Sequence, residues 1–74
     1  MVVAARPTFV HPIQAVVLAE FREMPAMRLT MPQVCRLWGL PRHEADAVVR
    51  SLVGRGLLAV DARGRVCRPE DVTP

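Results

Sequence analysis

Two apolar helical patterns separated by only three residues are the feature that most constrains how this chain can fold. They lie in the stretch LTMPQVCRLWGLPRHEADAVVRSLVGRGLL, residues 29–58, on either side of Gly39-Leu40-Pro41. Glycine readily adopts the left-handed conformation that follows the last turn of a helix. We therefore expect two short helices held close together by a tight turn, with a hairpin directly after them.

The first of these helices has clear signals at its start. Thr30 and Gln33 have the spacing of a capping box, in which each side chain bonds the backbone amide of the other residue. Pro32 falls in the first turn, where a missing amide donor leaves no hydrogen bond unmade. The side chains expected to face the core are Val34, Leu37 and Trp38.

The second helix, expected over residues 41–55, is amphipathic. One face repeats apolar residues with helical spacing, at Ala45, Val48, Val49 and Leu52. The opposite face is expected to be exposed, with Asp46 at its flank, and consists of His43, Ala47 and Arg50. Because Asp46 precedes Arg50 by four residues, we expect these two side chains to form an ion pair on the helix surface.

A further helix is expected before this stretch, over residues 12–24. Pro12 suits its first turn, and Pro25 ends it. Its buried stripe is expected to consist of Ile13, Val17, Phe21 and Met24. Apolar residues also lie on both shoulders of that stripe, at Val16, Leu18 and Ala19. Because a chain of 74 residues has a small core, this surplus predicts a homodimer formed through the first helix.

The segment after the helices predicts a β-hairpin over residues 57–68, with its turn from Asp61 to Gly64. Residues 69–74 are polar and bounded by proline, and we expect them to form a tail without regular structure. Residues 1–11 are expected to form a flexible N-terminal arm. The fold class that follows for residues 12–68 is mainly α with a small β-hairpin, namely a winged helix-turn-helix of three helices plus a wing.

The positive charge of the chain comes from arginine alone. The net charge is +3, and all ten basic residues are arginine. Arginine forms bidentate contacts with phosphate and guanine, which favours nucleic acid as a partner, although a GC-rich genome explains the same bias. No apolar run approaches the roughly 20 residues that cross a membrane, and the first residues lack the pattern of a secretory signal. We therefore expect a cytoplasmic protein without membrane contact.

The sequence shows no pattern for catalysis, metal binding or cofactor binding. Ser51 is the only serine, and there is no glycine-rich phosphate loop. The two cysteines show no CxxC spacing, so we expect no metal site and no cofactor. Cys35 is expected to pack as a small apolar residue in the core, and Cys67 to be half exposed in the returning strand. The sequence predicts that the chain is not an enzyme.

The segment LTMPQVCRLWGLPRHEADAVVRSLVGRGLLAVDARGRVCRP resembles the winged-helix DNA-binding domains of bacterial transcriptional regulators, especially the IclR and MarR types. The matching features are Leu29-Thr30, the Gly39-Leu40-Pro41 turn, residues 52–58, and a wing with Asp61, Gly64 and Arg65. The resemblance implies a third helix in the major groove and a wing along the backbone or minor groove. It implies base-facing positions at Arg42, His43, Glu44, Asp46, Ala47 and Arg50. It implies wing contacts from Arg63, Arg65 and Arg68.

Two functions are compatible with these features. The first is sequence-specific binding of double-stranded DNA by a small transcriptional regulator or its DNA-reading domain. Phosphate contacts are then expected from Arg42, Arg63 and Arg65. Base contacts are expected from Arg50 and His43, and two-fold pairing predicts a pseudo-palindromic site. The alternative is a docking module that binds another protein, which the mixed charge of Glu44 and Asp46 beside Ala47 favours.

Overall fold

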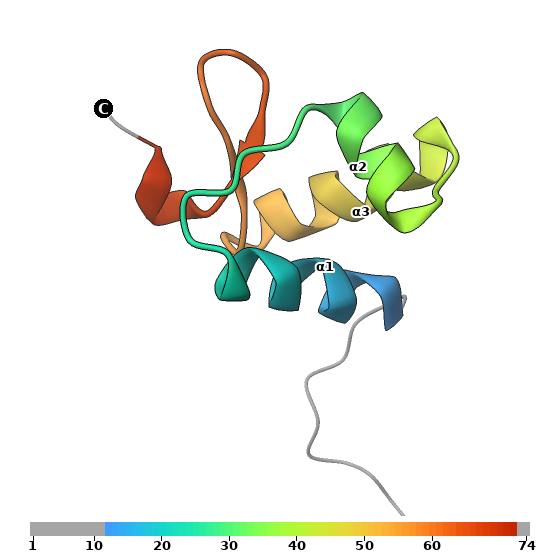
Figure 1. The fold of residues 1–74 in the computed structure, drawn as a ribbon, viewed down its shortest axis with the longest axis horizontal. Helices are drawn as coiled ribbons and strands as arrows, with labels where there is room; N and C mark the ends of the chain where they lie inside the picture. The colour runs from blue at the N-terminus through green and yellow to red at the C-terminus, as the bar shows by residue number, and fades with distance from the viewer. Residues whose placement is uncertain (1–11, 73–74) are drawn as a thin grey trace, which may run out of the picture.

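The computed structural model describes residues 12–72 of the chain. Within this range the elements are, in order, α1 (Pro12–Glu23), α2 (Met31–Trp38), α3 (Arg42–Gly54), β1 (Ala59–Val60), β2 (Val66–Cys67) and a short 3-10 helix, η1 (Pro69–Asp71). The expectation of a mainly helical domain with a small antiparallel hairpin is confirmed for these residues (Figure 1). The predicted N-terminal arm, residues 1–11, lies outside the described residues.

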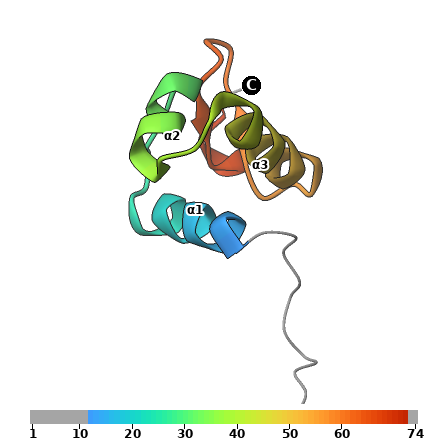
Figure 2. The same ribbon diagram turned by 90° about the vertical axis from the view of Figure 1, so that its right-hand side faces the viewer.

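The helices are arranged so that α1 and the hairpin turn lie at opposite ends of the molecule (Figure 1). Seen after a quarter turn, α2 and α3 lie side by side above α1, and the hairpin turn projects beyond them (Figure 2). α3 packs against both α2 and α1. α3 also packs against β1, while its residues 42–44, 47 and 50 are exposed to solvent.

The start and end of α2 follow from local sequence signals. The Thr30 hydroxyl accepts a hydrogen bond from the Gln33 amide at 3.3 Å, and the Gln33 side chain accepts one from the Thr30 amide at 2.8 Å. This is the predicted capping box. Gly39 ends the helix with a φ of 64°, in the left-handed region. The tight connection to α3 therefore depends on a conformation that glycine adopts without a steric penalty.

Substituting Gly39 tests this dependence. An added Cβ would meet nothing within 4 Å, so the cost of Gly39→Ala comes from the backbone conformation alone. We expect Gly39→Ala to lower the free energy of unfolding by about 1–2 kcal/mol. Gly54 is the matched control, because it lies at the end of α3 without a positive φ and also has open space around it. Gly54→Ala should leave stability unchanged or raise it by up to about 1 kcal/mol in urea unfolding.

The hairpin is short but is extended by a third segment. Ala59 pairs with Cys67 and Val60 with Val66 in an antiparallel register. Leu29, which directly precedes the cap of α2, forms a further antiparallel bridge to Val66. The Leu29 amide donates to the Val66 carbonyl at 2.9 Å, and the Val66 amide donates to the Leu29 carbonyl at 2.7 Å. Both edges of β2 are therefore occupied, one by β1 and the other by the entrance to α2.

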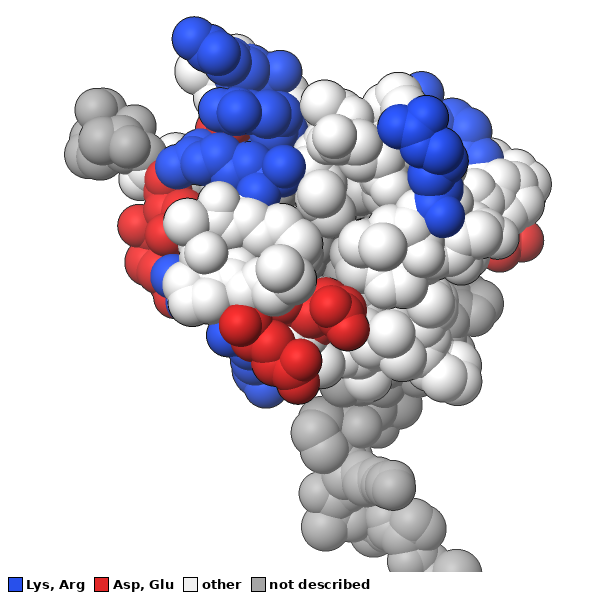
Figure 3. All heavy atoms as spheres, viewed as in Figure 1, with Lys and Arg blue, Asp and Glu red and all other residues white. Residues whose placement is uncertain are grey.

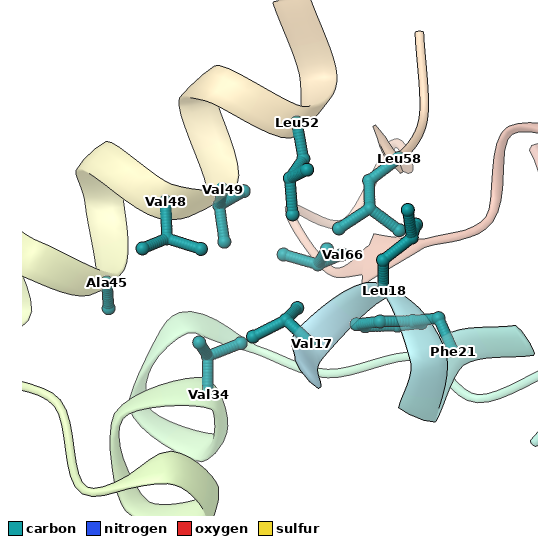
Figure 4. Close-up of a cluster of buried hydrophobic side chains, with 10 residues drawn as sticks. All are labelled: Val17, Leu18, Phe21, Val34, Ala45, Val48, Val49, Leu52, Leu58 and Val66. Atoms are coloured by element: carbon teal, nitrogen blue, oxygen red, sulfur yellow. The ribbon is translucent and has the colours of Figure 1, made fainter. Parts of the chain in front are cut away.

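The core lies where α1, α2, α3 and the hairpin meet, and its side chains point toward one another from all four (Figure 4). Phe21 is fully buried and lies against Trp38, with ring centroids 6.3 Å apart. The predicted apolar face of α3 is confirmed as the part of the core that this helix supplies. The buried core residues are Val17, Leu18, Phe21, Val34, Ala45, Val48, Val49, Leu52, Leu58 and Val66.

Two residues that were predicted to lie in the core, Met24 and Leu37, are exposed to solvent. Met24 is 52% exposed because α1 ends at Glu23 and the chain turns away before it can complete the stripe. Leu37 is 54% exposed because α2 turns Val34 and Trp38 inward, which leaves Leu37 on the outer side of the helix. On α1, Leu18 is part of the core, although it was predicted to lie beside the buried stripe of that helix.

The C-terminal part of the chain is more ordered than predicted. Residues 69–71 form η1, where a tail without regular structure was expected. Cys67 is fully buried and not half exposed, because β2 is enclosed between β1 and the Leu29 bridge. Burial raises the pKa of the Cys67 thiol, so it remains protonated and unreactive at neutral pH. Cys35 is partly buried against the core.

Candidate nucleic-acid interface

The solvent-facing side of α3, here called the α3 outer face, consists of Arg42, His43, Glu44, Asp46, Ala47 and Arg50. Apart from Asp46, which is half-buried, each of these residues is exposed. The prediction that this face is open to solvent is therefore confirmed. The side chain of His43 is 82% accessible to solvent, and its Nε2 lies 4.0 Å from the carboxylate of Glu44.

The ion pair on the α3 outer face differs from the one predicted. Asp46 accepts a hydrogen bond from Nε of Arg42 at 3.3 Å, whereas the predicted partner was Arg50. Both arginines are four residues from Asp46, so sequence spacing alone does not choose between them. Arg50 instead lines the groove between α3 and the hairpin. Within residues 12–72, no ion pair forms on the Arg50 guanidinium.

The groove beside Arg50 is shallow and mostly apolar. It has a volume of about 240 Å³ and lies between α3, the start of α2 and the hairpin. Its walls consist of Met31, Asp46, Val49, Arg50, Val53, Val60, Gly64 and Val66. Val60 is half exposed at its edge. Any large ligand that contacts the α3 outer face and the hairpin together therefore crosses this groove.

Within the hairpin turn, the side chain of Asp61 accepts hydrogen bonds from both backbone and side chains. Oδ1 accepts from the amides of Arg63 and Arg65, both at 2.9 Å. Oδ2 accepts from Nη1 of Arg28 at 2.9 Å and from Nε of Arg65 at 3.0 Å. Only 7% of the Asp61 side chain is accessible to solvent. The carboxylate therefore fixes the backbone of the turn and pairs with two arginines.

Sequence reasoning did not identify Arg28. Its guanidinium bonds Asp61 in the hairpin and also the backbone carbonyl of Asp71, at the end of η1. The partners are 33 and 43 residues away, so no local spacing signals them. The position of Arg28 directly before the Leu29 bridge brings its side chain to the hairpin.

The arginines of the hairpin region fall into two groups. Arg65 is paired with Asp61, and Arg68 is paired with Asp71 at 3.1 Å and with Glu70 at 3.6 Å. The expected phosphate contacts of Arg65 and Arg68 therefore stay a prediction, and in this structure carboxylates hold both guanidinium groups. Arg63 is exposed, and its side chain makes no ion pair within the described residues.

The acid response of the fold follows from the pKa of Asp61. The hydrogen bond from the Arg65 amide, together with those from Arg28 and the Arg63 amide, lowers the pKa of Asp61 from 3.8 to about 2, although burial acts in the opposite direction. A lowered pKa in the folded state stabilises the fold above the unfolded pKa. We expect unfolding experiments to show this contribution intact above pH ~4 and lost as the pH falls toward 2. The Asp61→Asn variant should lack this part of the acid transition.

On the face that Figure 3 shows, arginine side chains and acidic side chains gather over different elements, and some arginine atoms also lie beside the acidic side chains near α1. Arginine side chains form one patch over the hairpin turn and another over α2, whereas acidic side chains gather near the end of α1 and along η1. An extended anion would therefore meet a more favourable potential at the hairpin end of the molecule than at the α1 end.

Other types of site find no support among the described residues. Residues 12–72 bring no three His, Cys, Asp or Glu side chains together for a metal ion. None of their helices has the length and apolar character needed to cross a membrane. Comparison with models of protein families, with curated proteins and with solved structures found no match to this chain.

Proposed function

We propose that this chain is a winged helix that binds double-stranded DNA. In this proposal the α3 outer face enters the major groove, and the hairpin, residues 59–67, acts as the wing on the DNA backbone. One observation supports this most: Arg50 and Arg63, both exposed and without ion pairs in the described residues, lie on α3 and on the hairpin, with the open groove between these elements. A duplex lying across that groove meets both guanidinium groups.

The contacts of each arginine suggest its role. Arg50 is proposed to read bases and Arg63 to contact phosphate, because neither guanidinium group forms an ion pair within residues 12–72. Arg42 is proposed to bind a second phosphate, since its exposed pair with Asp46 is weak enough to exchange for one. His43 remains a candidate base contact. Arg65 and Arg68 are assigned to holding the hairpin and η1 in place.

A homodimer through α1 is part of the proposal. The outer side of α1 exposes Ala15, Val16 and Ala19 over successive turns. Pairing two chains on this side buries apolar surface and leaves both α3 outer faces free. Two-fold symmetry would then match a pseudo-palindromic site with half-sites about one DNA turn apart. The mass of the chain in solution tests the dimer directly.

A salt titration tests DNA binding most directly. If each chain neutralises the two phosphates proposed for Arg42 and Arg63, log K for a duplex should fall against log salt with a slope of about −1.8 per chain. Fluorescence anisotropy of a labelled duplex across salt concentrations measures this slope. Arg63→Ala should make the slope less negative by about one. Arg22→Ala, which changes an exposed residue of α1, should leave the slope unchanged.

The alternative function is docking to another protein, and one observation favours it. Leu37 is exposed beside a shallow pocket that Leu29, Gln33 and Arg36 also line. Apolar side chains of this kind are typical of protein contacts. No duplex binding at low salt, together with correct folding, would replace the DNA proposal with this one.

A further inference from the structure

Asp61 places a negative charge inside the part of the molecule proposed to meet phosphate. A carboxylate near phosphates ordinarily repels them. Its Oδ2 also holds Arg28 and Arg65, two guanidinium groups that would otherwise be available to DNA. From charge alone, removing Asp61 should therefore strengthen binding to a duplex.

The geometry of Asp61 predicts the opposite effect. Its Oδ1 bonds the amides of Arg63 and Arg65, and its own backbone bonds Arg65 and Gly64 across the same turn, at 2.9 Å each. The carboxylate thus fixes the backbone from which the Arg63 side chain projects. Arg28 extends this arrangement to η1 through the carbonyl of Asp71. The turn is therefore held both by Asp61 within the hairpin and by Arg28, which precedes α2.

We infer that Asp61 is a positioning residue of the DNA interface. It directs Arg63 outward by fixing the turn, and it keeps Arg28 and Arg65 in structural contacts. This inference rests on the proposed function, because the benefit of a fixed turn is a pre-ordered phosphate contact. The inference predicts that removing the negative charge of Asp61 weakens binding to the DNA duplex, which is itself negatively charged.

Two substitutions of Asp61 separate its roles. Asp61→Asn keeps an acceptor for the two amides but removes the charge that holds Arg28 and Arg65. Asp61→Ala removes both. We expect duplex affinity to fall about threefold in Asp61→Asn and about tenfold in Asp61→Ala, measured at one fixed salt concentration. Glu23→Gln is the control, since it removes an exposed carboxylate from α1, outside the proposed DNA interface, and should bind equally well or up to about threefold more tightly.

Hydrogen exchange supplies a readout that does not depend on DNA. In the unaltered chain the amides of Arg63 and Arg65 should exchange slowly, because both donate to the Asp61 carboxylate. In Asp61→Ala these amides should exchange faster, while the amides of α3 remain protected. In Asp61→Asn, whose side-chain oxygen still accepts from both amides, the increase should be smaller. Circular dichroism tests whether each variant is folded. If Asp61→Ala does not fold, the duplex affinity of Asp61→Asn still tests the inference.

The outcomes distinguish the inference from the function on which it rests. Tighter duplex binding by Asp61→Asn, or unchanged amide exchange at Arg63 and Arg65 in Asp61→Ala, overturns the positioning role while DNA binding stands. Absence of duplex binding by the unaltered chain at low salt overturns the proposed function and the inference together. Weaker binding with faster exchange confined to the turn supports both.

Discussion

Replacing Phe21 by alanine is expected to remove about half of the free energy of unfolding. Phe21 is fully buried, and its ring lies against Trp38 where α1 meets α2. Loss of a buried phenyl ring costs about 3–5 kcal/mol, and the whole free energy of unfolding of a chain this small is only about 5–10 kcal/mol. Urea unfolding followed by far-ultraviolet circular dichroism should show a transition at much lower denaturant.

Leu37→Ala is the control for Phe21→Ala. Leu37 is an exposed apolar residue of α2, so its truncation should change the free energy of unfolding by no more than about 0.5 kcal/mol. If the two variants unfold at the same urea concentration, the core does not lie where α1, α2 and α3 meet.

Reversing the charge of Arg50 and Arg63 together is expected to weaken duplex binding by about 100-fold or more, since each reversal removes a contact and adds repulsion. The single variants Arg50→Glu and Arg63→Glu should each weaken binding about tenfold. Both side chains are exposed and outside the ion pairs of the described residues, so folding should be unaffected. Anisotropy titration of labelled duplexes measures the affinities.

Arg22→Glu supplies the matched control, because it changes the net charge equally at an exposed position of α1, the helix at the opposite end of the molecule from the hairpin turn. Its affinity should stay within about threefold of the unaltered chain. Equal losses from Arg22→Glu and Arg50→Glu would mean that total charge, and not the α3 outer face, determines binding. Alanine variants separate the roles: Arg50→Ala should alter preference among sequences, and Arg63→Ala should weaken all duplexes alike.

Features decided by neighbouring residues could be predicted from the sequence. The Thr30 capping box and the Gly39 helix end depend on contacts within one helical turn, and both are present as expected. The buried and exposed sides of α3 follow from its period, which runs uninterrupted from Ala45 to Leu52. Long, regular patterns of this kind constrain the structure without knowledge of the rest of the chain.

Features decided by distant residues could not be predicted. Asp61 is bonded by Arg28 across 33 residues, and this contact determines which hairpin arginines are available. Cys67 is buried because Leu29 covers the outer edge of β2, a pairing that no local alternation signals. The choice of Arg42 over Arg50 as the partner of Asp46 was likewise ambiguous, since the two spacings are equal.

The bridge between Leu29 and Val66 has a mechanical consequence. Leu29 directly precedes the cap of α2, and its two hydrogen bonds to Val66 connect the returning strand to the first turn of that helix. A pull that lifts the strand away from the body of the domain is transmitted to the start of α2. We therefore expect residues 59–67 not to move independently of the rest of the domain. A force that tilts the hairpin should also tilt α2 and α3.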